Sequence, residues 1–317
     1  IFLRSMGTST DIDEKQMFML RPKGGDALVV RPEGTAPVAR AYIEHGMMNL
    51  PQPVKLWYSA PFFRYEHPQA GRFRQFWQFG FEVLGEISSA LDAQIIQIFY
   101  NVLKELKIKN LAVQVNSIGD SACRPYYKKI LVSYFKTRGN SLCADCRRRL
   151  KENPLRILDC KEEKCQRIVA GAPQIIDHLC EPCHRHFKEV LEFLDEMGLP
   201  YHLSPYLVRG LDYYTKTVFE IVEESTDGKA IGSLAGGGRY DNLTKILGGK
   251  ETPAVGGAAG IERIIEILRH GSGQEGIKFS RKSLPQIFIA QLGTSAKRKC
   301  LKLIEEFREE GIQVLES

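Results

Sequence analysis

Residues 60–85 read APFFRYEHPQAGRFRQFWQFGFEVLG, and this stretch decides the fold. Two runs rich in aromatic residues flank His67-Pro68-Gln69-Ala70-Gly71, a pattern that predicts two strands joined by a short turn. Side chains alternate between the faces of a strand, so the even-numbered residues from Arg72 to Glu82 share one face. The odd-numbered residues from Phe73 to Val83 share the other face. That face is apolar apart from Gln75 and is expected to pack against a core.

The even-numbered face has the composition of a nucleotide site. It carries Arg72, Arg74, Phe76, Gln78, Gly80 and Glu82, and on the preceding strand Arg64 and Glu66 also share a face. Guanidinium groups pair with phosphate, an aromatic ring stacks on a base, and glycine permits close approach of a ligand. A merely solvated face is the alternative, but such a face favours Lys, Thr, Ser and Glu. We therefore interpret the hairpin as the floor of a nucleotide site.

Composition limits the class of protein. The 317 residues are 43% hydrophobic and 26% charged, which is typical of a globular protein with two domains, or one large domain with an insertion. The net charge of +6 is compatible with an RNA partner without requiring one. No run of 18 apolar residues occurs, so no membrane span is expected. Eight cysteines, several in close pairs, favour the reducing cytoplasm over a secreted disulfide scaffold.

Several segments resemble one family in the expected order. Residues 63–66 (FRYE) and 71–76 (GRFRQF) resemble motif 2 of the class II aminoacyl-tRNA synthetases, and the stretch through Gly85 is similar to the histidyl-tRNA synthetase family. RPEGT at 31–35, LVRGLDYY at 207–214 and PAVGGAAGIER at 253–263 resemble further segments of that family, the last being motif 3. The family usually has a bulky residue where this chain has Gly257. The resemblance implies an α+β fold with a class II antiparallel sheet flanked by helices.

The resemblance also implies a domain order. It is catalytic core with motif 2 (1–119), a mainly helical insertion (120–200), continued core with the histidine-specific segment and motif 3 (201–272), a linker (273–285) and the start of an α/β anticodon-binding domain (286–317). Motif 1 is expected before Ile1 and the rest of the anticodon-binding domain after Ser317. The chain is thus expected to be a catalytic-core fragment of a homodimer.

The activity implied by the resemblance is that of a histidine–tRNA ligase in protein biosynthesis. Such an enzyme uses ATP and Mg²⁺ to convert histidine to histidyl-adenylate, then transfers the histidyl group to the 3′ end of tRNA(His). The alternative is the histidyl-tRNA synthetase-like regulatory subunit of ATP phosphoribosyltransferase, which binds histidine as a signal. Such subunits tend to lack the arginines of motifs 2 and 3, whereas Arg64, Arg209 and Arg263 are all present here.

The resemblance assigns roles to individual residues. The expected catalytic residues are Arg64 and Arg209, acting on the α-phosphate. The expected ATP-binding residues are Arg64, Glu66, Arg72, Phe76 and Arg263. The expected histidine-binding residues are Glu33, Thr35, Gln78, Glu82, Tyr214 and Tyr240. For Thr35 the alternative is a simple helix cap.

The insertion is rich in Lys and Arg and contains six cysteines spaced as candidate zinc ligands: Cys143, Cys146, Cys160, Cys165, Cys180 and Cys183. Their spacing could hold one structural zinc ion, with His184 or His186 in reserve. Reduced thiols are the alternative, and the resemblance implies no zinc in catalysis. Before the insertion, apolar residues spaced by three or four predict a helix over 89–106, where Ser89 and Asp92 resemble a capping box.

Overall fold

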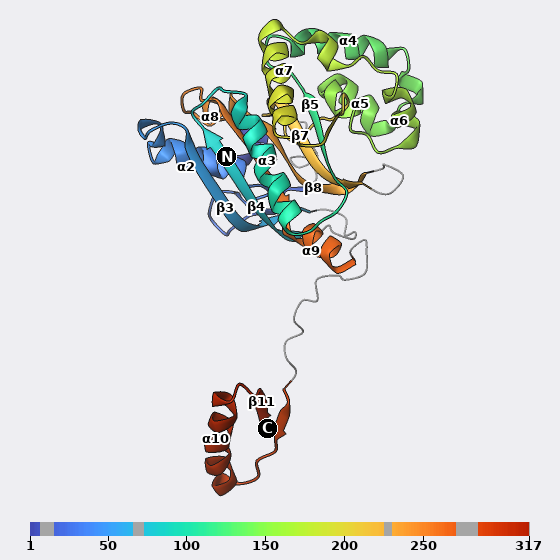
Figure 1. Cartoon of the computed structure of the whole chain (residues 1–317). Helices are drawn as coiled ribbons and strands as arrows, with labels where there is room; N and C mark the ends of the chain where they lie inside the picture. Colours follow the sequence, from blue (N-terminus) through green and yellow to red (C-terminus); the bar gives the residue numbers. More distant parts are fainter. Residues whose placement is uncertain (7–15, 66–72, 225–229, 271–284, 317) are drawn as a thin grey trace. The chain divides into compact units, whose positions relative to one another are not determined.

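The computed structural model describes residues 1–6, 16–65, 73–224, 230–270 and 285–316. These residues form two compact units, 1–267 and 268–317. The larger unit is built on one sheet with helices packed against it, so the predicted α+β class is confirmed (Figure 1). The turn predicted at 67–71 lies outside the described residues.

The sheet has seven strands in the order β3-β4-β9-β8-β7-β5-β6. All neighbours are antiparallel except β5 and β6. The strands are β3 (Val54–Phe63), β4 (Gln75–Leu84), β5 (Leu111–Ser117), β6 (Tyr201–Leu203), β7 (Thr215–Glu224), β8 (Ala230–Arg239) and β9 (Ala254–Gly260). Because β8 and β9 come late in the chain, the sheet brings residues 230–260 directly beside the first hairpin.

The hairpin pairs even-numbered residues with even-numbered residues, for example Phe62 with Phe76 and Ala60 with Gln78. On the odd-numbered face, Phe79 and Phe81 pack against Phe99 of helix α3 (Ala90–Glu105), with ring centroids 6.0 and 5.3 Å apart. The expectation of a buried face is wrong, however, at the N-terminal end of β4. Trp77 is 44% exposed and Phe73 is 49% exposed, because the aromatic packing on α3 begins only at Phe79.

Glycines let the central strands approach their neighbours closely. A Cβ atom on Gly257 would lie 3.0 Å from the ring of Phe99 and 3.1 Å from that of Phe219. The space that a bulky residue would occupy here is therefore filled by two aromatic rings from α3 and β7. This packing accounts for the departure from the family pattern at Gly257.

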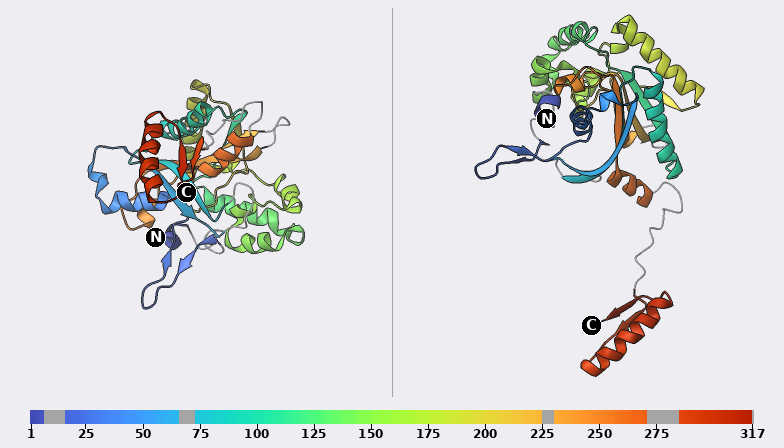
Figure 2. Two further views of the ribbon diagram at one scale, coloured as in Figure 1. Left: turned by 90° about the horizontal axis from the view of Figure 1, so that it is seen from below. Right: turned by 90° about the vertical axis from the view of Figure 1, so that its left-hand side faces the viewer.

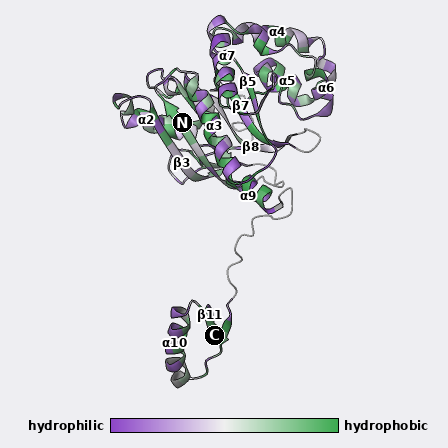
Figure 3. Ribbon diagram, in the orientation of Figure 1, coloured by the Kyte–Doolittle hydropathy of each residue, from purple (hydrophilic) through white to green (hydrophobic). Residues whose placement is uncertain are grey.

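The remaining helices of the larger unit fall into two sets. Outside the insertion they are α1 (Phe2–Met6), α2 (Thr35–Glu44), η2 (Met47–Asn49), α3, α8 (Leu243–Ile246) and α9 (Ile261–His270), together with the short antiparallel pair β1 (Met19–Leu20) and β2 (Leu28–Val29). Between β5 and β6 they are α4 (Arg124–Lys136), η3 (Gly139–Ser141), α5 (Ala144–Glu152), η4 (Pro154–Ile157), α6 (Glu163–Val169), η5 (Ile175–His178) and α7 (Glu181–Glu196). The hairpin of β1 and β2, coloured dark blue, protrudes from the rest of the larger unit (Figure 2). Helices α3 and α7 carry hydrophobic residues along only part of their surface, as packed amphipathic helices do (Figure 3).

The start of α3 differs from the predicted capping box. Ser89 makes no side-chain cap; its hydroxyl donates instead to Glu189 Oε2 at 2.7 Å. Asp92 is buried and binds Arg239 from the end of β8. The side chains of Ser89 and Asp92 therefore bind residues from distant segments, and they do not form the capping hydrogen bonds that their spacing predicted.

The smaller unit contains β10 (Ile287–Ile289) and β11 (Val314–Glu316), which are parallel, and the connecting helix α10 (Thr294–Glu309). This strand–helix–strand unit is short and begins near the boundary expected for the anticodon-binding domain. Within the part of the chain that the structure describes, no helix is long and apolar enough to cross a membrane.

Candidate functional site

A cavity of about 400 Å³ lies over the even-numbered face of the hairpin. Its floor runs across three strands, from Gln78 on β4 through Ala258 and Gly260 on β9 to Gly236 on β8. Small residues in a sheet leave room for a ligand to lie against the backbone. A ligand in the cavity can therefore contact the backbone of these strands, and larger side chains surround it.

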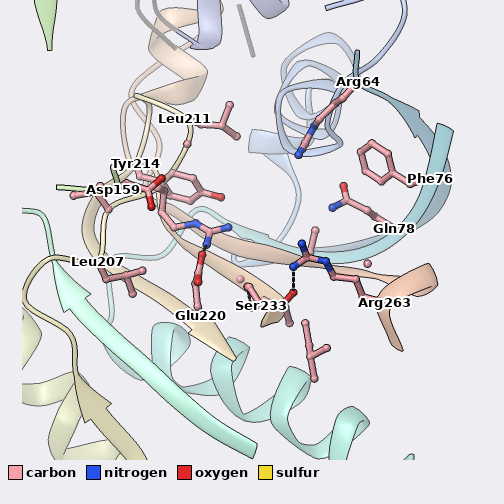
Figure 4. A pocket seen from close by; sticks show the side chains of 18 of the residues that line it. Arg64, Phe76, Gln78, Asp159, Leu207, Leu211, Tyr214, Glu220, Ser233 and Arg263 are labelled. Atoms are coloured by element: carbon pink, nitrogen blue, oxygen red, sulfur yellow. Dashed lines mark hydrogen bonds and ion pairs between the residues drawn. The ribbon is translucent and has the colours of Figure 1, made fainter. Parts of the chain in front are cut away.

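One wall of the cavity combines a cation, a ring and an amide. Arg64 lies directly after β3, and its guanidinium carbon lies 5.1 Å from the ring centre of Phe76. Its Nε donates to the carbonyl of Pro32 at 2.8 Å, and this hydrogen bond fixes the position of the guanidinium group. Gln78 points into the same space, two residues after Phe76 (Figure 4).

Two further arginines from the predicted motifs line the cavity. Arg209 enters from the segment before β7 and forms an ion pair with Glu220. Arg263 is in the first turn of α9, and its Nη1 donates to the carbonyl of Ser233 at 2.7 Å (Figure 4). Arg156 lines the cavity as well, so segments far apart in the sequence place four guanidinium groups around it, which suits a polyanion.

A buried carboxylate network lies beside the cavity. Glu82 is fully buried on β4; Thr35 donates its hydroxyl to Glu82 Oε1 at 2.6 Å, and Tyr240 donates to Oε2. Glu33 accepts from the backbone N–H groups of Thr35 at 2.6 Å and Ala36 at 3.1 Å, at the start of α2. The capping role is therefore filled by Glu33, whereas the Thr35 side chain turns toward Glu82.

Burial dominates the titration of this pair. It raises the pKa of Glu82 to about 8, although the hydroxyls of Thr35 and Tyr240 partly oppose the shift. Burial likewise raises the pKa of Glu33 to about 7, against the two backbone N–H bonds and the charge of Arg64. Among the described residues Glu82 has no cationic partner. An uncompensated buried carboxylate favours binding of a ligand that brings hydrogen-bond donors or positive charge.

Tyrosines line the network, and two of them had no role in the sequence-based assignment. Tyr213 donates to Glu33 Oε2 at 3.4 Å, and its ring centre is 4.7 Å from that of Tyr214. Tyr58 packs against glycines: a Cβ at Gly80 would lie 2.3 Å from its ring. Tyr213 is adjacent in sequence to the predicted residue Tyr214, and Tyr58 lies on β3 two residues before the stretch first singled out in the sequence. Closeness in sequence to predicted residues was therefore the available signal for both tyrosines.

The predicted residues thus fall into two adjoining groups. Arg64, Phe76, Gln78, Arg209, Tyr214 and Arg263 line the cavity. Glu33, Thr35, Glu82 and Tyr240 form the buried network. Tyr214 joins the groups, since it lines the cavity and its ring centre lies 6.5 Å from that of Tyr240. Glu66 and Arg72 lie outside the described residues.

The cysteines form two groups, not the single site expected. Cys143, Cys146, Cys160 and Cys165 make one group, and Cys180 and Cys183 join Cys123 and Asp120 in another. His184 and His186 belong to neither; His186 is buried and lies 3.3 Å from Asp92 instead. Spacing alone could not show this partition, because it depends on how α4 to α7 pack.

An antiparallel sheet with arginines around a glycine-lined floor, joined to a buried polar pocket, defines the catalytic domain of a class II aminoacyl-tRNA synthetase. A histidyl-tRNA synthetase family profile matches residues 2–122 and 146–264. The chain therefore belongs to the histidyl-tRNA synthetase family, as its sequence indicated. The unmatched residues 123–145 fall in the insertion.

Individual relatives agree with this assignment. The histidine–tRNA ligase of Caldicellulosiruptor saccharolyticus is 45% identical over 315 residues, which cover 99% of this chain and 74% of the relative. That of Dehalococcoides mccartyi is 45% identical over all 317 residues, again 74% of the relative. The solved structure of apo S. aureus histidyl-tRNA synthetase is 35% identical with a TM-score of 0.68, covering 95% of this chain and 72% of that one.

A fourth comparison supports the fold alone. The structure described as an ATP phosphoribosyltransferase regulatory subunit/histidyl-tRNA synthetase from Bacillus halodurans has a TM-score of 0.63 at 20% identity. It covers 99% of this chain and 81% of that one. That structure thus shares the architecture of this chain, while the 45% identities are with histidine–tRNA ligases.

Proposed function

We propose that the chain is the catalytic core of a histidine–tRNA ligase, which activates histidine with ATP and transfers it to the 3′ end of tRNA(His). The observation that carries the proposal is the juxtaposition of two sites. A cavity lined by arginines adjoins a buried carboxylate, Glu82, whose partners are neutral hydroxyls. One site suits a nucleotide, and the other suits a substrate that brings N–H donors.

In the histidine site, Glu82 and Tyr214 form hydrogen bonds with the two imidazole nitrogens, and the Glu82 carboxylate accepts from a ring N–H. Glu33, Thr35 and Gln78 bind the amino group, with Tyr240 beside them. The ammonium group and ring N–H of histidine provide the donors that the buried carboxylates lack. A site built for such donors rejects analogues without them by about 10⁴ or more, because its own polar groups would be left unpaired.

In the ATP site, Phe76 and Arg263 enclose the adenine, and Arg64 and Arg209 approach the α-phosphate. Glu66 and Arg72 are assigned to the adenine amino group and the terminal phosphates, respectively. Mg²⁺ would be held chiefly by the β- and γ-phosphates, and Glu220 and Glu262 are carboxylates of the cavity lining that could supply further oxygen ligands. When bound, it neutralises charge on the leaving pyrophosphate.

Activation proceeds by attack of the histidine carboxylate on the α-phosphorus, and the bond to the pyrophosphate oxygen breaks. Negative charge increases on the α-phosphate oxygens in the transition state. Fixed guanidinium groups of Arg64 and Arg209 stabilise that charge without having to reorganise, and little proton transfer is needed. In the second step a hydroxyl at the 3′ end of the tRNA attacks the activated carbonyl, and AMP leaves.

The same proposal places the protein in the cytoplasm as a homodimer with tRNA(His) as partner. It rests on membership of the histidyl-tRNA synthetase family.

The decisive assay is histidine-dependent ATP–pyrophosphate exchange by the full-length protein. Exchange should require histidine, and histidinol should inhibit without supporting it, because its alcohol cannot replace the carboxylate. Histidine binding without any exchange would instead indicate the regulatory-subunit function and overturn the proposal.

A further inference from the structure

Three of the four α-helices of the insertion begin at a cysteine, and the fourth has a cysteine in its first turn. Cys123, Cys143 and Cys180 are the N-cap residues of α4, α5 and α7, and Cys165 lies in the first turn of α6. The N-terminus of a helix carries partial positive charge and stabilises a thiolate. Four helix starts thus direct thiol groups toward two points in the fold.

At the first point, helices α5 and α6 meet. The four sulfur atoms of Cys143, Cys146, Cys160 and Cys165 all lie within 4.8 Å of one another, and three of these residues are buried. The sulfurs of Cys143 and Cys160 are 3.9 Å apart. Thiolates around one tetrahedral zinc ion lie about 3.8 Å apart, given a Zn–S bond of about 2.3 Å.

At the second point, α4 and α7 meet. Asp120, Cys123, Cys180 and Cys183 each offer a ligand atom, again all within 4.8 Å of one another. Asp120 Oδ1 lies 3.7 Å from the sulfur of Cys123 and 3.9 Å from that of Cys180. Three thiolates and one carboxylate make a tetrahedral ligand set that zinc accepts.

We propose that the insertion contains two structural zinc sites, one at each of these points. Backbone N–H groups already support the sulfur ligands, as at established thiolate sites: Cys143 N–H donates to the sulfur of Cys165 at 3.3 Å, and Asp120 N–H donates to that of Cys123 at 3.3 Å. Sulfur-rich tetrahedral sites select zinc or iron–sulfur clusters. The close spacing favours a single ion over a cluster.

The two zinc sites hold the segment 209–214 at both ends. From the first site, η4 extends between Cys146 and Cys160, and Arg156 on η4 donates to the carbonyl of Arg209 at 2.8 Å. From the second, Arg124 follows Cys123 directly and donates to the carbonyl of Tyr214. The insertion therefore acts on the substrate site through the backbone of the residues that line it.

Different kinetic effects follow from the two connections. This consequence rests on the proposed ligase function, whereas the zinc sites themselves do not. Loss of the second site should affect Tyr214 and thus raise the KM for histidine. Loss of the first should displace Arg209 and lower kcat. A misplacement of about 1 Å can cost up to about 10²-fold in activity, and we expect an effect of about tenfold from these indirect connections.

Zinc and iron content per chain is the direct test, measured by inductively coupled plasma mass spectrometry on the untagged full-length protein. We expect about two zinc ions in the native protein and about one in each of Cys146→Ser and Cys183→Ser. Cys300→Ser, in α10, is the matched control and should retain both. Iron in place of zinc, metal well below one ion per chain, or disulfides among these cysteines would overturn the proposal.

Cobalt substitution of the native protein avoids variants that fail to fold. Two Co²⁺ ions should bind with thiolate charge-transfer bands and the d–d bands of tetrahedral geometry, and zinc should displace them. Octahedral spectra would contradict the sites. For the positioning role, Cys183→Ser should raise the KM for histidine about tenfold while the KM for ATP changes little. A KM for histidine equal to that of Cys300→Ser would exclude that role, whatever the metal content.

Discussion

Asp92 and Glu82 are both carboxylates buried in the larger unit, yet their surroundings differ completely. Asp92 faces the Arg239 guanidinium, with Nε to Oδ2 at 3.0 Å, and His186 lies on its other side. Burial alone would raise the pKa of Asp92, but Arg239 and His186 more than offset it, so the pKa is lowered. Within the described part of the chain, the side chain of Glu82 has only hydroxyl partners, and burial raises its pKa to about 8.

The difference separates a structural charge from a functional one. Arg239 is fully buried and also binds Asp241 and the carbonyls of Glu86 and Ser88, so its charge is satisfied within the fold. Glu82 is left with an unsatisfied requirement for positive charge or further donors. We infer that a ligand provides them, and that the fold accepts the cost of an unpaired carboxylate to bind it.

The largest expected effect is on stability. Arg239→Met removes the cation from Asp92 and leaves a buried carboxylate uncompensated, which should lower the free energy of unfolding by about 3–5 kcal/mol. Urea denaturation of the variant measures this. Glu44→Gln, which breaks only an exposed ion pair with Arg40, should change stability by less than about 0.5 kcal/mol. Equal stability of the two variants would remove the distinction drawn above.

The next effect is on catalysis. Arg209, unlike Arg239, has one carboxylate partner and faces a cavity. Arg209→Ala should slow histidine-dependent pyrophosphate exchange by about 10² or more, while histidine still binds. Arg40→Ala, on the exposed side of α2, is the control. Normal exchange in the Arg209 variant would remove this residue from the catalytic assignment.

Glu82→Gln tests the other half of the comparison. It removes the charge at nearly constant shape, so histidine binding should weaken by about 10- to 100-fold and ATP binding much less. Folding stability should change little, because no cation loses its partner. Glu223→Gln, at a buried glutamate outside the cavity lining, is the matched control. Equal losses of histidine and ATP binding would argue against the assigned role, as determined by isothermal titration calorimetry.

The smallest effect is the pH dependence of histidine binding. Glu82 binds histidine as a carboxylate, and its pKa is raised, so it is increasingly protonated as the pH falls below about 8. Affinity for histidine should therefore rise about tenfold from pH 7.0 to 8.5 and then level off. Glu82→Gln should flatten this profile. A native affinity that fell with rising pH would show that Glu82 is already ionised in the free protein.

Much of the site was predictable because the hairpin encodes it locally. Strand periodicity alone put Phe76, Gln78 and Glu82 on one face, and the structure has them there. Periodicity could not show which residues of β4 pack against α3. Trp77 and Phe73 were therefore expected to be buried, but both are exposed. Asp92 was taken for a cap because its partner, Arg239, is 147 residues away.

The sequence by itself determined the sheet-and-helix class, the order of the motifs and the residue types around the proposed nucleotide site, because these follow from local periodicity and recognisable segments. Only the tertiary structure decided which charges are paired, how the cysteines divide into two groups, and that no cation from residues 1–6, 16–65, 73–224, 230–270 or 285–316 pairs with Glu82. Pairing and burial depend on contacts between segments far apart in the chain. Those contacts set the local dielectric and the partners on which the chemistry depends.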